Sequence, residues 1–157
     1  MKPDTGNAPR LDLSPLHLLH RAGQCAGDVF TSQIGSLELT PRQFAVLTTV
    51  ASAEGLSQTD LVERTGIDRS TLADIVARML KKGLLQRRRT KDDARAYAVR
   101  LTEEGQRLLQ LAKPVVEDVD QRLLEPVPVK RRQQFLEDLA LLVGVLGQPG
   151  ALLARPR

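Results

Sequence analysis

The stretch from Ser57 to Leu101 constrains the fold of this chain more than any other part of its sequence. It reads as two short helices joined by a turn, followed by two strand-like runs with a charged connection between them. Ser57 is followed three residues later by Asp60, the spacing of a capped helix start, and Gly66 can adopt the left-handed conformation that ends a helix. The order of elements therefore predicts a helix-turn-helix followed by a β-hairpin.

The second of these helices is expected to span Asp68–Lys82, with Asp68 as its N-cap. Apolar residues recur in it at helical spacing and predict one buried stripe, made of Leu72, Ile75, Val76, Met79 and Leu80. The opposite face is polar and mostly small, and it carries Ser70, Ala73, Asp74, Ala77, Arg78 and Lys81. Gly83 should end the helix, and strands are expected over Leu84–Arg89 and Tyr97–Leu101.

Positive charge is concentrated on this stretch of the chain. Nine lysines and arginines lie between residues 78 and 100, opposed only by Asp92 and Asp93, while the whole chain has a net charge of only +4. A local field of this kind favours a polyanionic partner. A helix-turn-helix with a basic hairpin is a winged helix, a unit that reads double-stranded DNA. An ordinary helical hairpin with a solvated basic face is the alternative, and the turn glycine and the small polar face argue against it.

The segments on either side of this unit predict three further apolar helices. The first follows the Ser14-Pro15 start over Leu16–Gly35, the second follows the Thr102 cap and contains Pro114, which is expected to kink it, and the third covers about 129–146. A separate helix from Thr40-Pro41 to about Ala53 belongs to the winged unit. One small unit cannot bury three apolar helices, so we expect a homodimer, whose two-fold symmetry suits a palindromic operator.

The predicted fold class is therefore mainly α with a small β-hairpin wing. The expected organisation is a mobile arm over residues 1–13, dimerisation helices over 14–36 and 102–147, a winged helix-turn-helix over 37–101 and a frayed tail over 148–157. No secretory signal and no apolar run of membrane-spanning length is present, so a bacterial cytoplasmic protein without a membrane partner is expected.

Enzyme and metal chemistry find little support in the residues. No nucleophile, base and orienting group come together in a motif, and no phosphate-binding glycine loop is present, so we expect neither an enzyme nor a cofactor. His17 and His20 share a helix face, but Cys25 does not lie on it and no second ligand cluster exists, so no metal site is expected. Cys25 is interpreted as inert core, with a redox-sensing repressor as the alternative.

Several motifs of this chain resemble the MarR (multiple antibiotic resistance regulator) family of bacterial transcription factors. They are the DDAR run at 92–95, the VRLTEEG run at 99–105 and the GLL run at 83–85. The resemblance implies a homodimer with one winged helix per subunit and a recognition helix at Asp68–Lys82 in the major groove. It also implies that Arg95 enters the minor groove and that Asp93 orients it. Many members have a basic residue at the position of Asp74, so the operator sequence does not follow from the resemblance.

The candidate DNA-binding residues fall into three groups. Ser70, Thr71, Asp74 and Arg78 are candidates for reading base edges, and an Asp74–Arg78 helix salt bridge is an equally open interpretation. Phosphate contacts are expected from residues near the helix starts, namely Ser57, Thr59 and Arg69. The wing is expected to contribute Arg87, Arg89, Lys91, Asp93 and Arg95.

The resemblance also suggests a small-molecule effector, bound between the dimerisation helices and the winged helix. Aromatic acids and related anions are the expected ligands, and the polar candidates near that place are His17, His20, Arg21, Gln24 and Arg42. The HLLHRAG and RSTLADIV runs are similar to the subgroup that responds to hydroxycinnamoyl-CoA thioesters. An architectural DNA-binding protein with no effector is the rival interpretation.

Overall fold

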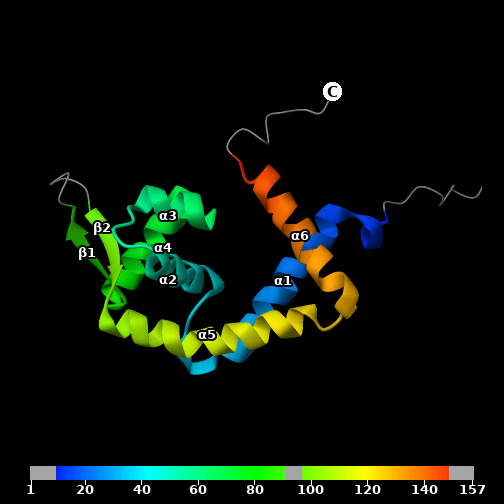
Figure 1. Ribbon diagram of the computed structural model, residues 1–157, viewed down its shortest axis with the longest axis horizontal. Helices are drawn as coiled ribbons and strands as arrows, with labels where there is room; N and C mark the ends of the chain where they lie inside the picture. Colours follow the sequence, from blue (N-terminus) through cyan, green and yellow to red (C-terminus); the bar gives the residue numbers. More distant parts are fainter. Residues whose placement is uncertain (1–9, 91–96, 149–157) are drawn as a thin grey trace, which may run out of the picture.

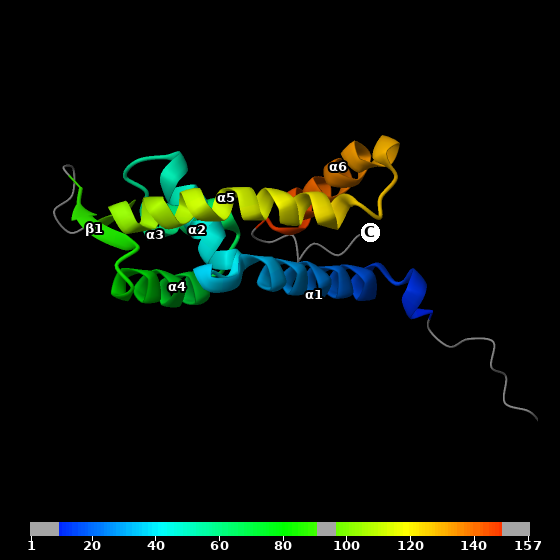
Figure 2. The same cartoon turned by 90° about the horizontal axis from the view of Figure 1, so that it is seen from below.

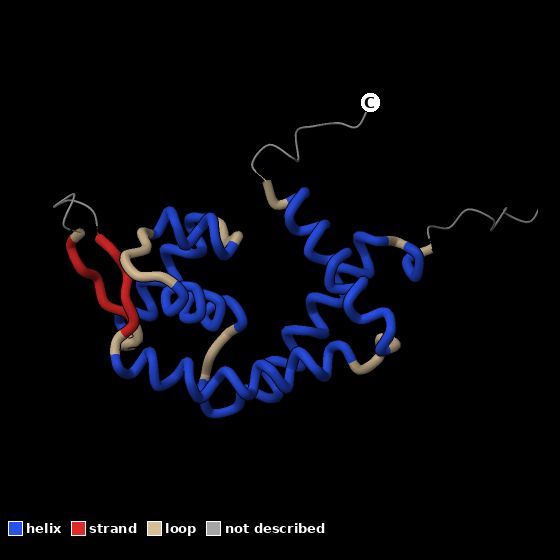
Figure 3. The backbone as a smooth tube through the Cα atoms, viewed as in Figure 1, coloured by secondary structure: helices blue, strands red, loops and turns tan. Residues whose placement is uncertain are grey.

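The computed structural model describes residues 10–90 and 97–148 of the chain. It is mainly helical with one two-stranded antiparallel hairpin, as the sequence predicts (Figures 1 and 3). In chain order the elements are η1 (Leu11–Leu13), α1 (Pro15–Ile34), η2 (Gly35–Leu37), α2 (Pro41–Ser52), α3 (Gln58–Thr65), α4 (Arg69–Lys81), β1 (Leu85–Arg89), β2 (Tyr97–Leu101), α5 (Glu103–Leu124) and α6 (Val129–Leu146).

The hydrophobic core lies mainly in the unit formed by α2, α3, α4 and the hairpin. Its most deeply buried side chains are Leu47, Leu61, Leu72, Met79, Val46, Val76 and Val99. Buried residues of α5, among them Leu109 and Ala112, join the same cluster. No polar or charged residue is buried among those that the structure describes. The unit is therefore held mainly by apolar packing, and each of its described polar residues keeps part of its surface exposed.

The predicted helix starts are confirmed in atomic detail. Thr40 accepts a hydrogen bond from the Gln43 backbone N–H at 3.2 Å, and the Gln43 side chain accepts one from the Thr40 N–H at 3.1 Å. The same reciprocal bonding joins Ser57 and Asp60, whose distances are 3.1 and 2.7 Å. Gly66 ends α3 with a φ of 68°, a conformation that glycine adopts without strain. These local bonds fix where α2 and α3 begin and how the chain turns between α3 and α4.

α5 joins the two ends of the molecule. It runs from the wing to the turn before α6, with α1 packed along it (Figures 1 and 2). Thr102 ties its start to the end of the preceding helix, because the Thr102 hydroxyl donates to the Gly83 carbonyl at 2.6 Å and accepts from the Gly105 N–H at 3.0 Å. The helix continues through Pro114, so this proline does not end it; the kink expected there stays a prediction.

At the end of the expected arm, residues 11–13 form the short helix η1, and Arg10 forms an ion pair with Asp12, with 2.7 Å between Nη2 and Oδ2. One expectation about the N-terminal region is wrong. Cys25 is exposed on α1 rather than buried in a core. Within a single chain only Phe30 and Ile34 of this helix are buried, so the face of α1 that carries Cys25 is not packed into the core.

Candidate nucleic-acid interface

The two faces of α4 differ as the sequence predicts. Leu72, Ile75, Val76 and Met79 are buried, whereas the opposite face is exposed and carries Ser70, Ala73, Asp74, Ala77, Arg78 and Lys81. The Asp68 side chain caps the helix by accepting from the Thr71 backbone N–H at 2.9 Å. Hydrogen bonding from Thr71 also lowers the pKa of the Asp68 carboxyl below its ordinary value. The helix is thus anchored on one side and presents short polar groups on the other.

Asp74 and Arg78 are joined in an ion pair on this exposed face. Nη2 of Arg78 lies 3.0 Å from Oδ2 of Asp74, and both side chains are mostly exposed. The structure therefore supports the salt-bridge interpretation of this pair in the free chain. An exposed pair of this kind contributes little to stability, so each side chain can exchange its partner for a group on a ligand.

The residues expected to hold phosphates differ in what their side chains already do. The Ser57 hydroxyl donates its proton to Asp60 Oδ2 at 2.7 Å and accepts from the Asp60 N–H, so its one donor is already used within the helix cap. These bonds from Ser57 also lower the pKa of the Asp60 carboxyl. Thr59 and Arg69, by contrast, are exposed in the first turns of α3 and α4. They remain the accessible candidates near the two helix starts.

The strand register separates the wing arginines onto two faces. Arg87 pairs with Val99, Arg89 pairs with Tyr97, and Arg88 pairs with Ala98. Because side chains alternate along a strand, Arg87, Arg89 and Tyr97 share the ribbon face of Leu85 and Val99, which belong to the core that also contains α4. Arg88 lies on the other face. Lys91, Asp93 and Arg95 lie outside the described residues, so their predicted roles at the wing tip stay predictions.

A pocket lies between α1, α2 and α5, in the region where an effector was expected. Its volume is about 290 Å³, and its walls are apolar except for Asp120; the residues around it include Gly23, Gly27, Phe30, Phe44, Val116 and Val119. Ideal Cβ atoms added to Gly23 and Gly27 would meet nothing within 4 Å, so these two glycines leave the space open. None of these lining residues was predicted from the sequence, although Gly23 and Gly27 lie one helical turn apart, a spacing that indicates a hollow in a helix surface.

None of the five residues predicted to bind a ligand lines this pocket. Arg21 and Gln24 hydrogen-bond to each other at 3.0 Å on the surface of α1, and His20 is exposed while His17 is half-buried. Arg42 lines a different hollow, of about 420 Å³, beside Thr65, Gly66 and Asp68. Within one chain the predicted set is therefore not brought together, because the four residues of α1 and Arg42 of α2 belong to different surfaces.

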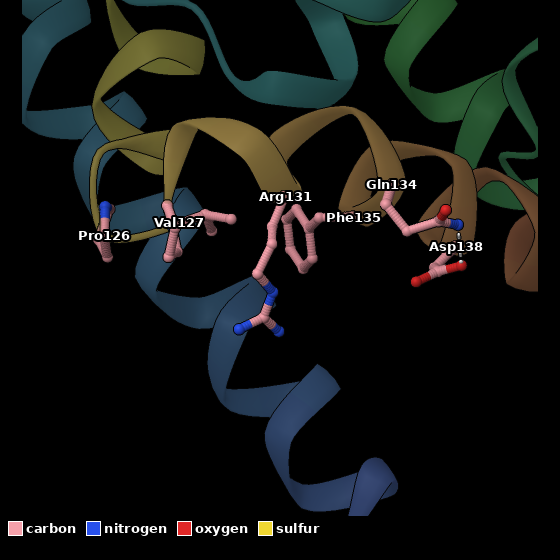
Figure 4. Close-up of a pocket in the computed structure, with 7 residues that line it drawn as sticks. Pro126, Val127, Arg131, Gln134, Phe135 and Asp138 are labelled. Carbon is pink, nitrogen blue, oxygen red and sulfur yellow. Dashed lines mark hydrogen bonds between the residues drawn. The ribbon is translucent and has the colours of Figure 1, made fainter.

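A further hollow, of about 360 Å³, lies where the turn after α5 meets α6 (Figure 4). Arg131 and Phe135 extend from α6 into it, and Gln134 donates a hydrogen bond to Asp138 at 3.0 Å. No residue of α6 is buried. This helix therefore exposes most of its apolar side chains, Phe135 among them, instead of packing them within the chain.

The described residues contain no group of three or more histidine, cysteine, aspartate or glutamate side chains arranged to hold a metal ion. None of the described helices is long and apolar enough to cross a membrane.

Comparison with known proteins identifies the chain's relatives. Residues 37–96 match a sequence model described as the MarR family. The transcriptional regulator HosA of Escherichia coli is 33% identical over 100 residues, which cover 64% of this chain and 74% of HosA. Among solved structures, the PcaV transcriptional regulator from Streptomyces coelicolor, in complex with its natural ligand, superposes with a TM-score of 0.82 at 30% identity, covering 88% of this chain and 97% of PcaV.

A DNA-bound structure is also similar. The transcriptional repressor CouR bound to a 23-mer DNA duplex matches with a TM-score of 0.78 at 27% identity, covering 87% of this chain and 99% of CouR. The winged-helix fold is thereby confirmed, and the relatives are regulators of transcription rather than enzymes. Because the chain is 33% identical to HosA over 74% of the length of HosA, it belongs to the MarR family of transcriptional regulators.

Proposed function

We propose that this regulator is a homodimeric repressor that binds a palindromic operator through α4 and the wing, and that a small aromatic or anionic ligand releases it. The observation that carries the DNA-binding part is the exposed face of α4. It holds Ser70, Asp74 and Arg78 in solvent, while the apolar face of the same helix is buried. A helix anchored in this way can enter a major groove without loss of core packing.

Each group of predicted residues has a proposed role at the DNA. Base edges are read by Ser70, Thr71, Asp74 and Arg78. Phosphates are held by Thr59 and Arg69, and Ser57 supports the start of α3. On the wing, the DNA backbone is contacted by Arg87, Arg89 and Lys91, and the minor groove is entered by Arg95, which Asp93 orients. The division of labour follows the predicted boundaries, with DNA binding over residues 37–101 and dimerisation through 14–36 and 102–147.

The exposed apolar side chains of α1 and α6 support a dimer. Leu16 on α1 is 81% exposed, and Val143 on α6 is 73% exposed, although both would favour burial. Exposed apolar surface of this extent on two helices is typical of an interface. A second copy of the chain is its proposed occupant, because a two-fold dimer also places two copies of α4 on one duplex.

The dimer is tested by sedimentation at micromolar concentration, where the chain should run at twice its mass. Leu142→Glu on α6 should shift the protein toward monomer, whereas Asp28→Glu on α1, which preserves charge at an exposed position, should not. A well-behaved wild-type monomer would contradict the proposal.

The pocket between α1, α2 and α5 is the proposed effector site. The rings of Phe30 and Phe44 and its volume of about 290 Å³ suit a ligand with a single aromatic ring. Asp120 is its only charged lining residue, so an anionic group would need cations from elsewhere. The pocket is too small for a whole acyl-CoA, of which only the aromatic acyl end would enter.

A thermal-shift screen of aromatic acids and their CoA esters, followed by release from operator DNA, tests the effector. Gly27→Leu should fill the pocket and abolish both responses while leaving operator affinity unchanged, because a side chain at position 27 enters open space. Thr31→Leu, at an exposed position of the same helix that does not line the pocket, is the matched control. If no compound in the screen shifts the melting temperature or releases DNA, the effector-independent architectural interpretation replaces this one.

The exposure of Cys25 keeps a redox-sensing repressor as the second candidate. Peroxide would oxidise an accessible thiol and release the operator from wild-type protein. If a ligand rather than the thiol controls the protein, Cys25→Ser leaves operator binding and its response to peroxide unchanged. Release of the wild type but not of the variant would instead establish redox sensing.

A further inference from the structure

A small polar crevice lies behind the wing, on the ribbon face opposite Arg87 and Arg89. Its volume is about 240 Å³, and it is bounded by the end of α2, by both strands and by the first turns of α5. The polar groups around it are the amides of Gln86 and Gln106, the guanidinium groups of Arg88 and Arg100, and the carboxylate of Glu54. The strand register places Gln86 directly opposite Arg100, and Arg88 lies two residues along on the same face.

One donor at this crevice, the Arg100 Nε–H, lacks an acceptor within the described chain. Arg100 Nε is shielded from solvent and has no hydrogen-bond partner there, and it is the one side-chain polar atom of the described residues for which this holds. Neither Arg88 nor Arg100 forms a salt bridge with a described residue. The Gln86 amide reaches the Leu101 carbonyl only at 3.5 Å. Because buried donors are nearly always satisfied, a partner from outside the chain is expected here.

The charges of the crevice select the kind of partner. Two guanidinium groups outnumber one carboxylate, and Glu54 is exposed and pairs with neither arginine. Guanidinium groups bind tetrahedral oxyanions through paired N–H donors, and side-chain amides can donate to the remaining oxygens. The volume lies below the roughly 300–1,000 Å³ of pockets for drug-sized ligands. A small oxyanion therefore fits better than a nucleotide, and the guanidinium and amide groups around the crevice suit it better than an aromatic ring.

We propose that this crevice is a binding site for a free phosphate-type oxyanion, held by Arg88 and Arg100. The free ion is favoured over a phosphate of operator DNA because the site opens on the ribbon face away from Leu85 and Val99, which pack into the core with α4. An ion bound there ties the hairpin to the end of α2 and to Gln106 of α5. The site is separate from the α1–α2–α5 pocket and does not depend on the effector proposed for it.

The test uses inorganic phosphate on the full-length protein, titrated to about 20 mM with chloride keeping the ionic strength constant. The melting temperature of the wild type should rise and saturate as a bound ligand requires, and the Arg100 Nε–H signal in a nitrogen–proton correlation spectrum should shift with the same midpoint. Arg88→Gln and Arg100→Gln should each lose the saturable rise. Phosphate also stabilises proteins nonspecifically, but that effect does not saturate and should be equal in all variants.

Arg87→Gln and Arg89→Gln are the matched controls, since they remove the same charge from the opposite face of the same strand. They should keep the phosphate response and lose operator affinity, whereas Arg88→Gln should keep operator affinity within about threefold in phosphate-free buffer. If Arg100→Gln fails to fold, Arg88→Gln still tests the proposal, because Arg88 is exposed and its replacement should not affect folding. No saturable shift in the wild type, or a response that persists in both Arg88→Gln and Arg100→Gln, would overturn the proposal. Loss of operator affinity in Arg88→Gln equal to that in Arg87→Gln would show that the site holds DNA instead.

Discussion

Arg78 and Asp74 lie one turn apart on the exposed face of α4, and the guanidinium Nη2 of Arg78 is 3.0 Å from Oδ2 of Asp74. Arginine recognises guanine through two parallel hydrogen bonds, for which the plane of its guanidinium must be held in place. An aspartate one turn earlier on the helix can hold that plane. The negative charge of Asp74 also opposes phosphates that approach without a matching base.

Arg78→Ala should weaken specific binding by about 1–3 kcal/mol and relax the base preference at one position of each half-site. Asp74→Ala should lower the specificity of DNA binding for two reasons. Removal of the negative charge raises the affinity for nonspecific DNA, and Arg78 loses the partner that orients it. The ratio of specific to nonspecific affinity, measured by fluorescence anisotropy at fixed salt, should fall in both variants. The melting temperature should not change, since the pair is exposed. An unchanged ratio in Asp74→Ala would show that the two side chains form only a surface pair.

The helices of the winged unit could be predicted closely because their ends are determined locally. The Thr40 and Ser57 capping boxes, the Asp68 cap and the left-handed Gly66 depend on residues within one turn of each other. The pocket between α1, α2 and α5 could not be predicted in the same way. It depends on how these three helices pack together, and it is lined by Gly23, Gly27 and two phenylalanines rather than by the polar residues that the sequence singles out.

The N-terminal helix shows a second reason for failure. Cys25 has apolar neighbours in the sequence, and a stripe that is apolar on several sides does not say which side packs within the chain. In the structure only the face with Phe30 and Ile34 is buried, and Cys25 lies outside it. The sequence pattern predicts that such a helix packs both within its own chain and against a second chain. It does not tell which of the two contacts each apolar residue makes.

The wing tip gives a prediction that rests on the resemblance, since Asp93 and Arg95 lie outside the described residues. Arg95→Ala should lower specific affinity by about 1–3 kcal/mol with little change in melting temperature, because a wing tip buries little apolar surface. Asp93→Ala should have a weaker effect in the same direction. The double variant should bind the operator only slightly more weakly than Arg95→Ala alone, because Asp93 acts through Arg95. Binding of Arg95→Ala as tight as that of wild type at physiological salt would remove Arg95 from the interface.

Two helix glycines should respond to alanine in opposite directions. A Cβ atom at Gly105 would run into the carbonyl oxygen of Leu84, so Gly105→Ala should lower the free energy of unfolding by about 1–3 kcal/mol. At Gly27 a Cβ meets nothing within 4 Å, so Gly27→Ala should stabilise α1 by about 0.5–1 kcal/mol. Urea denaturation of the two variants measures both changes. Equal effects of the same sign would contradict the close approach of α5 to the end of α4.

The helix caps predict how stability depends on pH. Hydrogen bonds from Ser57 and Thr71 lower the pKa values of Asp60 and Asp68, so the folded chain binds fewer protons on them than the unfolded chain. Their contribution is therefore complete above about pH 4 and is lost as the pH falls through the folded-state pKa values. Asp68→Asn still caps α4 but cannot ionise, so its free energy of unfolding should depend less steeply on pH in this range. A slope equal to that of wild type would mean that the Asp68 carboxyl does not contribute.

Selection of binding sites from a pool of randomised duplexes tests the central claim most directly. A dimer that reads DNA through two copies of α4 should enrich an inverted repeat whose half-sites lie about one helical turn, 10 base pairs, apart. Selection with Arg78→Ala should return the same repeat with one position of each half-site relaxed. Enrichment of a single asymmetric site, or of no sequence at all, would contradict the account of a two-fold regulator that reads its operator through α4.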